Sequence, residues 1–359
     1  MKLLRIALCV CIAGLVVSTW SQAPGRTPTV TIFSAPNAGT GANQGTYPIG
    51  ITSNGTVGGY YADVNDVHHG FIRTLDGTLT VFDIPEAGSG PGQGTEIEAM
   101  NSNGDSTGWY FKADGRGHPY LRTAKGGVTL FDIPDMMMGG SSGITDGGVI
   151  VGGYWDQNWL LRGFVRSQTG EISTFDMPRS RPGAWNEGTQ PWYSTNQSSA
   201  SIGWSWDEDG WPHGWIRTAQ GLVNEFNASG VSGTMPWGIS PQGAITGIVV
   251  DENWGNHGFV RDVNGNYTIF DAPGSENGGG TGPEVINAAG TVIGNYWDPT
   301  GNNHGFIRAA DGTFTVLDLP GAGKGNYQGT LPGGMNAQGW IVGQIVDDNM
   351  STKSFVMIR

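Results

Sequence analysis

The 359-residue chain is poor in cysteine, in charge and in long apolar runs, and each shortage excludes a class of protein. Its two cysteines, Cys9 and Cys11, both lie near the N-terminus, so disulfide bonds cannot hold the remainder together. Charged residues make up 14% of the chain, and the formal net charge is -13. Such a chain repels phosphate backbones and anionic membranes, so we expect no nucleic-acid partner.

The clearest apolar run is typical of a secretory signal. Lys2 and Arg5 precede an apolar stretch at 8–17, and Ser21 and Ala23 are small enough to flank a cleavage site. We therefore expect residues 1–23 to be a signal peptide, whose apolar run is too short to span a membrane. The mature chain, 24–359, would then have no membrane span and would be secreted or extracellular, with a periplasmic location as the alternative.

Glycine is abundant, with 62 residues, and it marks a repeat. The unit reads Gly-x3-Asp-x5-His-Gly-Phe-x-Arg and is complete at 59–73, 247–261 and 294–308. Degenerate copies begin at Gly108, Gly152, Gly203 and Gly343, which makes seven copies in all. Their spacing of roughly 47 residues falls in the range of propeller blades and solenoid units.

One copy predicts four short strands. In the copy at 45–85, extended runs alternate with tight-turn signals such as Ser53-Asn54-Gly55 and Asp76-Gly77, and no stretch of the mature chain has a helical period. Apolar residues point to both sides of a strand, so both faces of each small sheet must be buried against other parts of the protein. A closed ring supplies that cover without polar end caps.

The chain termini favour closure of the ring. The last copy stops after its third strand, whereas the segment 29–36 matches the fourth-strand segment 78–85. We therefore predict an all-β, seven-bladed β-propeller of four-stranded antiparallel blades, in which an N-terminal strand completes the last blade. The predicted blades are about 45–85, 94–134, 140–178, 188–228, 233–273, 280–320, and 329–359 plus 28–36.

The repeat resembles that of the HAF-type extracellular repeat proteins. The matching elements are the turn at 285–290, the strand at 292–296 and His304-Gly305-Phe306, and the resemblance extends over nearly the whole mature chain. It implies a secreted or surface bacterial protein. It carries over no catalytic residue.

Aspartate and a cation six residues apart recur in this repeat, which favours a structural clasp over a metal site or a catalytic pair. The pairs are Asp63 and His69, Asp156 and Arg162, Asp207 and His213, Asp251 and His257, and Asp298 and His304. We expect no cofactor and no metal, with Asp207 and Asp209 in an oxygen-rich turn as the better calcium candidate. His68 lies outside the register and is interpreted as an exposed loop histidine.

Candidate ligand-binding residues vary from copy to copy. The position after Gly-Thr-x-Pro at the start of each innermost strand holds Ile49, Glu98, Ser142, Trp192, Trp237, Glu284 and Gly333. Loops between second and third strands add Trp159, Trp211 and Trp254, and we expect all five tryptophans to share one face. Indoles and carboxylates together suit a neutral sugar, although packing under loops is the alternative for each indole.

Three functions are compatible with this pattern. The first is a non-enzymatic module that binds a glycan or another extracellular polymer. The second is a carbohydrate-active enzyme, a glycoside hydrolase or polysaccharide lyase, that uses Glu98 and Glu284 as paired carboxylates. The third is a protein-interaction or surface-structure component, and the oligomeric state is open.

Overall fold

The structure is a computed structural model that describes residues 28–177, 188–195, 200–275 and 279–359, with the side chains of 192–195 left aside. The expected signal peptide lies outside the described residues. The described residues form strands and turns and contain no α-helix. Among them is no helix with the length and apolarity needed to cross a membrane.

The strands follow one another in antiparallel groups. The first groups are β2 (Gly45–Ile51), β3 (Val57–Ala62), β4 (His68–Arg73) and β5 (Leu79–Phe82); β6 (Gly94–Met100), β7 (Ser106–Phe111), β8 (Gly117–Arg122) and β9 (Val128–Leu130); and β10 (Met136–Ile144), β11 (Ile150–Asp156), β12 (Leu161–Arg166) and β13 (Ile172–Phe175). The next are β14 (Gln190–Thr195), β15 (Ser201–Trp206), β16 (Pro212–Arg217) and β17 (Val223–Phe226); β18 (Gly233–Ile239), β19 (Ile245–Val250), β20 (Asn256–Arg261) and β21 (Tyr267–Phe270); and β22 (Gly280–Ile286), β23 (Val292–Trp297), β24 (Asn303–Arg308) and β25 (Phe314–Leu317). The last is β26 (Gly329–Met335), β27 (Ile341–Val346) and β28 (Thr352–Ile358), joined by β1 (Thr29–Phe33).

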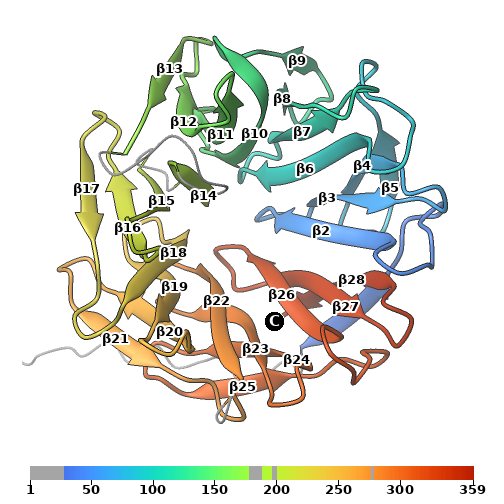
Figure 1. Cartoon of the computed structure of the whole chain (residues 1–359). Helices are drawn as coiled ribbons and strands as arrows, with labels where there is room; N and C mark the ends of the chain where they lie inside the picture. The colour runs from blue at the N-terminus through green and yellow to red at the C-terminus, as the bar shows by residue number, and fades with distance from the viewer. Residues whose placement is uncertain (1–27, 178–187, 196–199, 276–278) are drawn as a thin grey trace, which may run out of the picture.

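These groups are the blades of a propeller, arranged around a common centre with the first strand of each innermost (Figure 1). Three blades are separate four-stranded sheets, and the others belong to one 16-stranded sheet. Within that sheet, strand pairing between the described blades consists of parallel bridges of one residue pair each, His68 with Gly94, Asn303 with Gly329 and Gly45 with Thr352.

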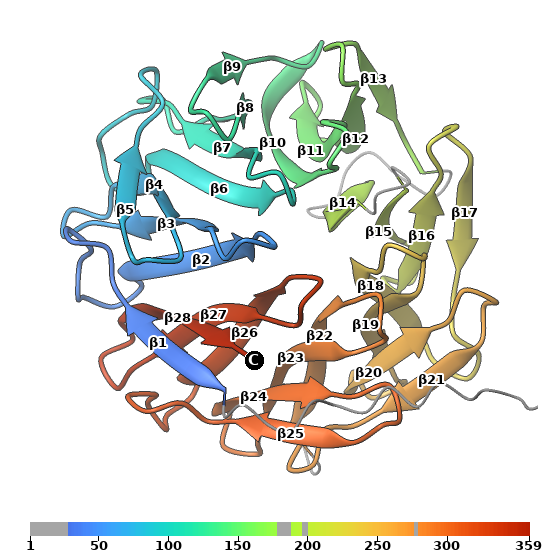
Figure 2. The ribbon, with the colours of Figure 1, turned by 180° about the vertical axis from the view of Figure 1, so that it is seen from behind.

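The two termini close the ring. β1 pairs antiparallel with β28 from Thr29 opposite Ile358 to Phe33 opposite Ser354, as expected from the match between 29–36 and 78–85, and Figure 2 shows the two strands side by side. One buried cluster joins Val342 and Val356 of the last blade to residues of the first blade, including Phe71. The hydrophobic core is therefore continuous across the junction of first and last blades.

Repeated polar and aromatic contacts join neighbouring blades. The threonine of the Gly-Thr pair at the start of an innermost strand accepts a hydrogen bond from a backbone N–H just after the last strand of the preceding blade. In one example, the N–H of Ile84 donates to Thr95 Oγ1 at 2.9 Å. The arginine of Gly-Phe-x-Arg lies over an aromatic ring of the preceding blade: Arg122 is 4.6 Å from the centre of Phe82, and Arg308 is 4.6 Å from the centre of Phe270. Such cation–π contacts contribute about 0.5 to 2 kcal/mol each, depending on burial.

The predicted clasp is present but has a second, shorter half. His304 Nε2 lies 3.5 Å from Asp298 Oδ2, whereas its Nδ1 lies 2.8 Å from Oδ1 of Asp318, at the end of β25. His69 repeats this with Asp83 at 2.9 Å and Asp63 at 3.9 Å. The prediction was incomplete because it left out the aspartate of the recurring Phe/Leu-Asp-x-Pro segment.

The first aspartate of each clasp also holds its own loop. Asp63 Oδ1 accepts hydrogen bonds from the backbone N–H groups of Asn65 and Val67, at 2.8 and 2.9 Å. Burial opposes ionisation, but these bonds and His69 lower the pKa of Asp63. The carboxylate therefore caps the turn between second and third strands as well as facing the histidine.

Candidate functional site

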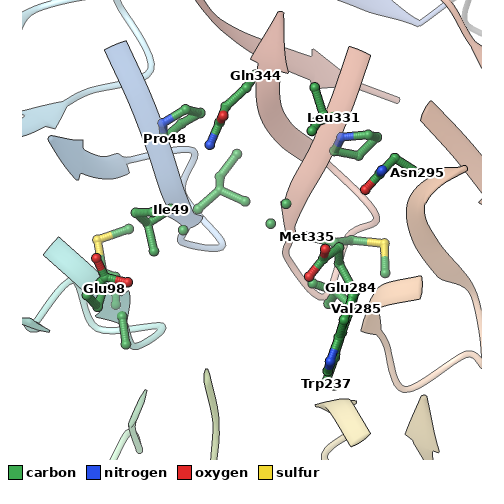
Figure 3. Close-up of a pocket in the computed structure, with 18 of the residues that line it drawn as sticks. Pro48, Ile49, Glu98, Trp237, Glu284, Val285, Asn295, Leu331, Met335 and Gln344 are labelled. Atoms are coloured by element: carbon green, nitrogen blue, oxygen red, sulfur yellow. The ribbon is translucent and has the colours of Figure 1, made fainter. Parts of the chain in front are cut away.

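A central cavity of about 470 Å³ lies where the innermost strands converge. Glu98, Trp237 and Glu284 line it, as the variable position after Gly-Thr-x-Pro predicts. Figure 3 shows Glu98 on one side and Glu284 with Trp237 on the other. Ile49 and Gly333 also belong to the wall, whereas the side chain of Trp192 lies outside the described residues.

β-bulges at this variable position explain why these side chains face the centre. The pairing register shifts between Ile97 and Ala99, between Pro236 and Gly238, and between Pro283 and Val285. A bulge leaves its extra residue out of the ladder and re-aims its side chain. These three blades therefore each offer one inward position that is free of the constraints of strand pairing.

Glu284 has an altered acidity. Its side chain keeps some surface in the cavity but is surrounded by protein, and this burial raises its pKa to about 7. Among the described residues of the cavity wall, Glu98 is the other ionisable group. A carboxylic acid that titrates near neutrality can donate or accept a proton at physiological pH.

The loop tryptophans form a second aromatic region, which we call the rim. Trp159 and Trp254 are 60% and 56% exposed, and Trp211 stacks on Trp254 with ring centres 4.3 Å apart and planes at 20°. Trp254 is held in place because Asp251 Oδ1 accepts hydrogen bonds from the N–H groups of Asn253 and Gly255. The exposed indoles therefore stand on ordered turns.

Both exposed rim tryptophans have a backbone conformation that disfavours them. Their φ angles are 60° and 63°, in the left-handed region, where three equivalent turns have glycine (Gly115, Gly210 and Gly301) and two have Asp66 and Met350, both with φ at 61°. A bulky side chain there costs of the order of 1 kcal/mol. The stack on Trp211 offsets part of this cost for Trp254, but both indoles keep more than half of their surface exposed, so burial gives little reason for tryptophan at these positions.

Cavity and rim lie toward opposite ends of the strands, so the expectation that Trp237 shares a face with Trp159, Trp211 and Trp254 is wrong. Gly238, next to Trp237, pairs with Thr246, near the turn between first and second strands, whereas Trp254 follows β19 at its other end. The four steps from Thr246 to Val250 correspond to about 13 Å along the strand. The ring of Trp237 extends from this bulge to the next blade, where a Cβ atom on Gly282 would lie 3.3 Å from it.

The sequence interpretation missed some exposed and cavity-lining residues. Tyr327, 65% exposed with φ at 62°, lies in the link before β26, and its N–H donates to the carbonyl of Gly301 on the rim side. Asn295 and Gln344 line the central cavity from second strands. The sequence could have indicated Asn295 and Gln344, because the residue after the glycine of the second strand varies from copy to copy, as in β23 and β27.

Two polar groups have roles that differ from the first interpretation. Asp207 Oδ1 accepts the N–H groups of Asp209 and Trp211, and its Oδ2 lies 2.7 Å from His213 Nε2, so the calcium candidate is part of the clasp. The described part of the chain contains no cluster of three or more potential metal-ligating side chains. His68 is not in an exposed loop: it lies in β4, with Nδ1 2.5 Å from Glu96 of the next blade.

Comparison with known proteins gives the fold. No protein-family model and no curated protein matches the chain. It is similar to the β-propeller domain of the Trilobed protease from Pyrococcus furiosus, with 10% identity, a TM-score of 0.56, and coverage of 87% of this chain and 95% of that one. It is also similar to oligogalacturonate lyase from Vibrio parahaemolyticus, with 12% identity, a TM-score of 0.56, and coverage of 92% and 97%.

A third similar structure is the BP39L lectin from Burkholderia pseudomallei, with 9% identity, a TM-score of 0.53, and coverage of 86% and 93%. The chain spans 64% of the length of TolB from Acinetobacter baumannii, another match, at 14% identity and a TM-score of 0.47. At these identities the likeness concerns the fold, and it supports a β-propeller.

Proposed function

We propose that this chain is a secreted, seven-bladed β-propeller that binds a glycan or another extracellular polymer without altering it. The rim carries the proposal: Trp159 and Trp254 are exposed in left-handed turns that favour glycine, and Trp211 supports Trp254 by stacking. Indole faces bind the apolar faces of sugar rings, and rigid aromatic side chains lose little entropy on binding. The similar lectin structure is compatible with this function but does not carry it.

The finer statements about architecture and location belong to the same proposal. Seven blades follow if the single-residue bridges within the 16-stranded sheet are counted as contacts between blades. The blade bounds, the signal peptide at 1–23, an extracellular or periplasmic location and membership of the HAF-type repeat proteins rest on the sequence.

Retention on insoluble polysaccharides tests the proposed binding. We expect the wild-type protein to bind at least one of cellulose, chitin and cross-linked galactan, and a Trp159→Asn, Trp254→Asn double variant to lose at least tenfold in affinity. Leu222→Ala is the matched control, because Leu222 is 67% exposed in the turn between β16 and β17, at the other end of the strands from the rim. Equal retention of the double variant and the wild type would contradict the proposal.

A carbohydrate-active enzyme is the second candidate. Its supporting observation is that Glu284, with a pKa of about 7, and Glu98 line the same cavity. One carboxyl would serve as acid and the other as base or nucleophile. Release of reducing ends or unsaturated products by the wild type, abolished in Glu98→Gln and Glu284→Gln, supports this candidate. No turnover over a panel of neutral and acidic polysaccharides counts against it.

A further inference from the structure

A second cavity, of about 160 Å³, lies between the β6–β9, β10–β13 and β14–β17 blades. We call it the interblade pocket. Its apolar walls are Trp109, Trp155, Leu161 and Pro191, and its polar walls are Glu98, Ser142 and Gln190. Glu98 also lines the central cavity, so it forms a shared wall between the two cavities.

The pocket exists because one blade has glycine at both positions of a cross-strand pair in which every other blade has at least one larger side chain. In the β10–β13 blade the cross-strand pair is Gly140 with Gly153. The equivalent pairs are Tyr47 with Tyr60, Glu96 with Trp109, Gln190 with Trp204, Met235 with Ile248, Gly282 with Asn295, and Leu331 with Gln344. The β10–β13 blade therefore lacks both side chains at the level where its neighbours fill the interblade space.

The indole walls are held in place before any ligand enters. Trp109 stacks on Phe111, with ring centres 5.7 Å apart and planes at 9°. A Cβ atom on Gly140 would lie 2.0 Å from Trp109, so the ring rests directly on that backbone. Trp155 faces Trp109 at 6.2 Å with the planes tilted by 49°, which leaves a wedge instead of a closed stack.

Two polar atoms of the pocket residues have unmet hydrogen-bonding capacity. Ser142 Oγ and Gln190 Oε1 are buried, and neither has a hydrogen-bond partner among the described residues. Leaving such an atom unpaired is unfavourable, and a side-chain rotation toward the cavity lets a ligand hydroxyl satisfy it. Glu98 is the one ionisable group among the described pocket residues, and the chain as a whole is acidic, so the site disfavours an anion.

From these features we infer that the interblade pocket binds one neutral, hydroxylated six-membered ring, as in a hexose. The ring's apolar faces contact Trp109 and Trp155, and its hydroxyls reach Gln190, Ser142 and Glu98. The volume is below the roughly 300 to 1,000 Å³ of drug-sized sites, which limits the occupant to a single ring. This pocket is separate from the rim and goes beyond the proposed polymer binding.

Filling the pocket is the most direct test. A Cβ atom on Gly153 would lie 3.4 Å from Leu161 and from Pro191, so a side chain fits there, and the equivalent residue of the β18–β21 blade is Ile248. The probes are D-glucose, D-galactose, D-mannose and N-acetyl-D-glucosamine, titrated into full-length mature protein by calorimetry and tryptophan fluorescence. D-glucuronate is the charged counterpart of D-glucose.

We expect at least one neutral sugar to bind and D-glucuronate to bind at least tenfold more weakly than D-glucose. Gly153→Ile should weaken neutral-sugar binding at least tenfold, with a melting temperature within about 4 °C of the wild type. Gln190→Met, which removes only the amide, is the second variant and should weaken the same binding. Leu222→Ala is the control. A wild type that binds none of the sugars, or a correctly folded Gly153→Ile with wild-type affinity, overturns the inference. Polysaccharide retention by the rim is measured separately, so failure there leaves this result intact.

Discussion

The β10–β13 and β18–β21 blades share one repeat but differ in what they place inside the ring. Phe164 and Phe259 occupy the same repeat position, and both are fully buried. At the inner cross-strand pair the first blade has Gly140 and Gly153, and the second has Met235 and Ile248. The difference teaches that the outer strands and interblade contacts specify the blade, while the inner positions are free to form either a wall or a cavity.

The largest expected effect tests the shared part of the two blades. Phe164→Ala and Phe259→Ala each remove a ring that is 0% exposed, and each should lower the free energy of unfolding by about 3 to 5 kcal/mol. Denaturant unfolding measures both. If one blade tolerated the change and the other did not, the two phenylalanines would not be equivalent scaffold positions.

The next largest expected effect concerns the inner cross-strand pair, which differs between the two blades. Ile248 is 2% exposed, so Ile248→Ala should cost about 2 to 5 kcal/mol. The reverse exchange, Gly153→Ile, fills an existing cavity and should change stability by less than about 1.5 kcal/mol in either direction. Thermal unfolding of the two variants gives the comparison. A large loss in Gly153→Ile would mean that the pocket is not open to a side chain.

Glu284 gives a pH-dependent prediction for the central cavity. Its pKa is raised from 4.5 to about 7, so the folded protein holds a proton that the unfolded chain releases between these pH values. The contribution of Glu284 is fully present below pH 4.5 and is lost as pH rises through about 7. Relative to Glu284→Gln, the wild type should lose about 1 to 3 kcal/mol across that window, measured by denaturant unfolding. Parallel curves for the two proteins would contradict the raised pKa.

The smallest effect compares the clasps of the same two blades. Asp176 pairs with Arg162, and Asp271 lies 2.8 Å from His257 Nδ1. Partial burial disfavours the charged form of His257, but Asp271 and Asp251 outweigh it and raise the pKa of His257. The stability that charged His257 contributes is therefore present below about pH 6.5 and is lost as pH rises through the raised pKa. Asp271→Asn should therefore cost up to about 1 kcal/mol at pH 5.5 and clearly less at pH 9, where a neutral imidazole keeps only a hydrogen bond, whereas Asp176→Asn should cost the same at both.

Thermal unfolding of both variants at the two pH values checks this contrast. A pH-independent cost of Asp271→Asn would show that His257 does not act through its charge.

The sequence predicted the scaffold well because each scaffold residue recurs. Strand order, the closing strand at 29–33 and the inward position of Glu98, Trp237 and Glu284 all follow from aligned copies. The interblade pocket was missed because it depends on what is absent, two glycines facing each other across strands, and on tryptophans contributed by adjacent blades. The separation of rim and cavity was missed because the prediction did not place Trp237 along its strand: β18 begins at Gly233 on the rim side, and Trp237 is nearer its other end at Ile239.

Polysaccharide binding and stability, measured together in Trp254→Asn, show whether the rim is a binding site. Asparagine adopts left-handed turns more readily than tryptophan, so a purely structural Trp254 predicts unchanged polymer retention. If the rim binds glycans, the variant should melt close to the wild-type temperature, because the lost stack on Trp211 offsets the relieved backbone strain, while losing at least tenfold in retention. A variant that keeps the full polysaccharide retention of the wild type would contradict the proposal that the rim binds the polymer.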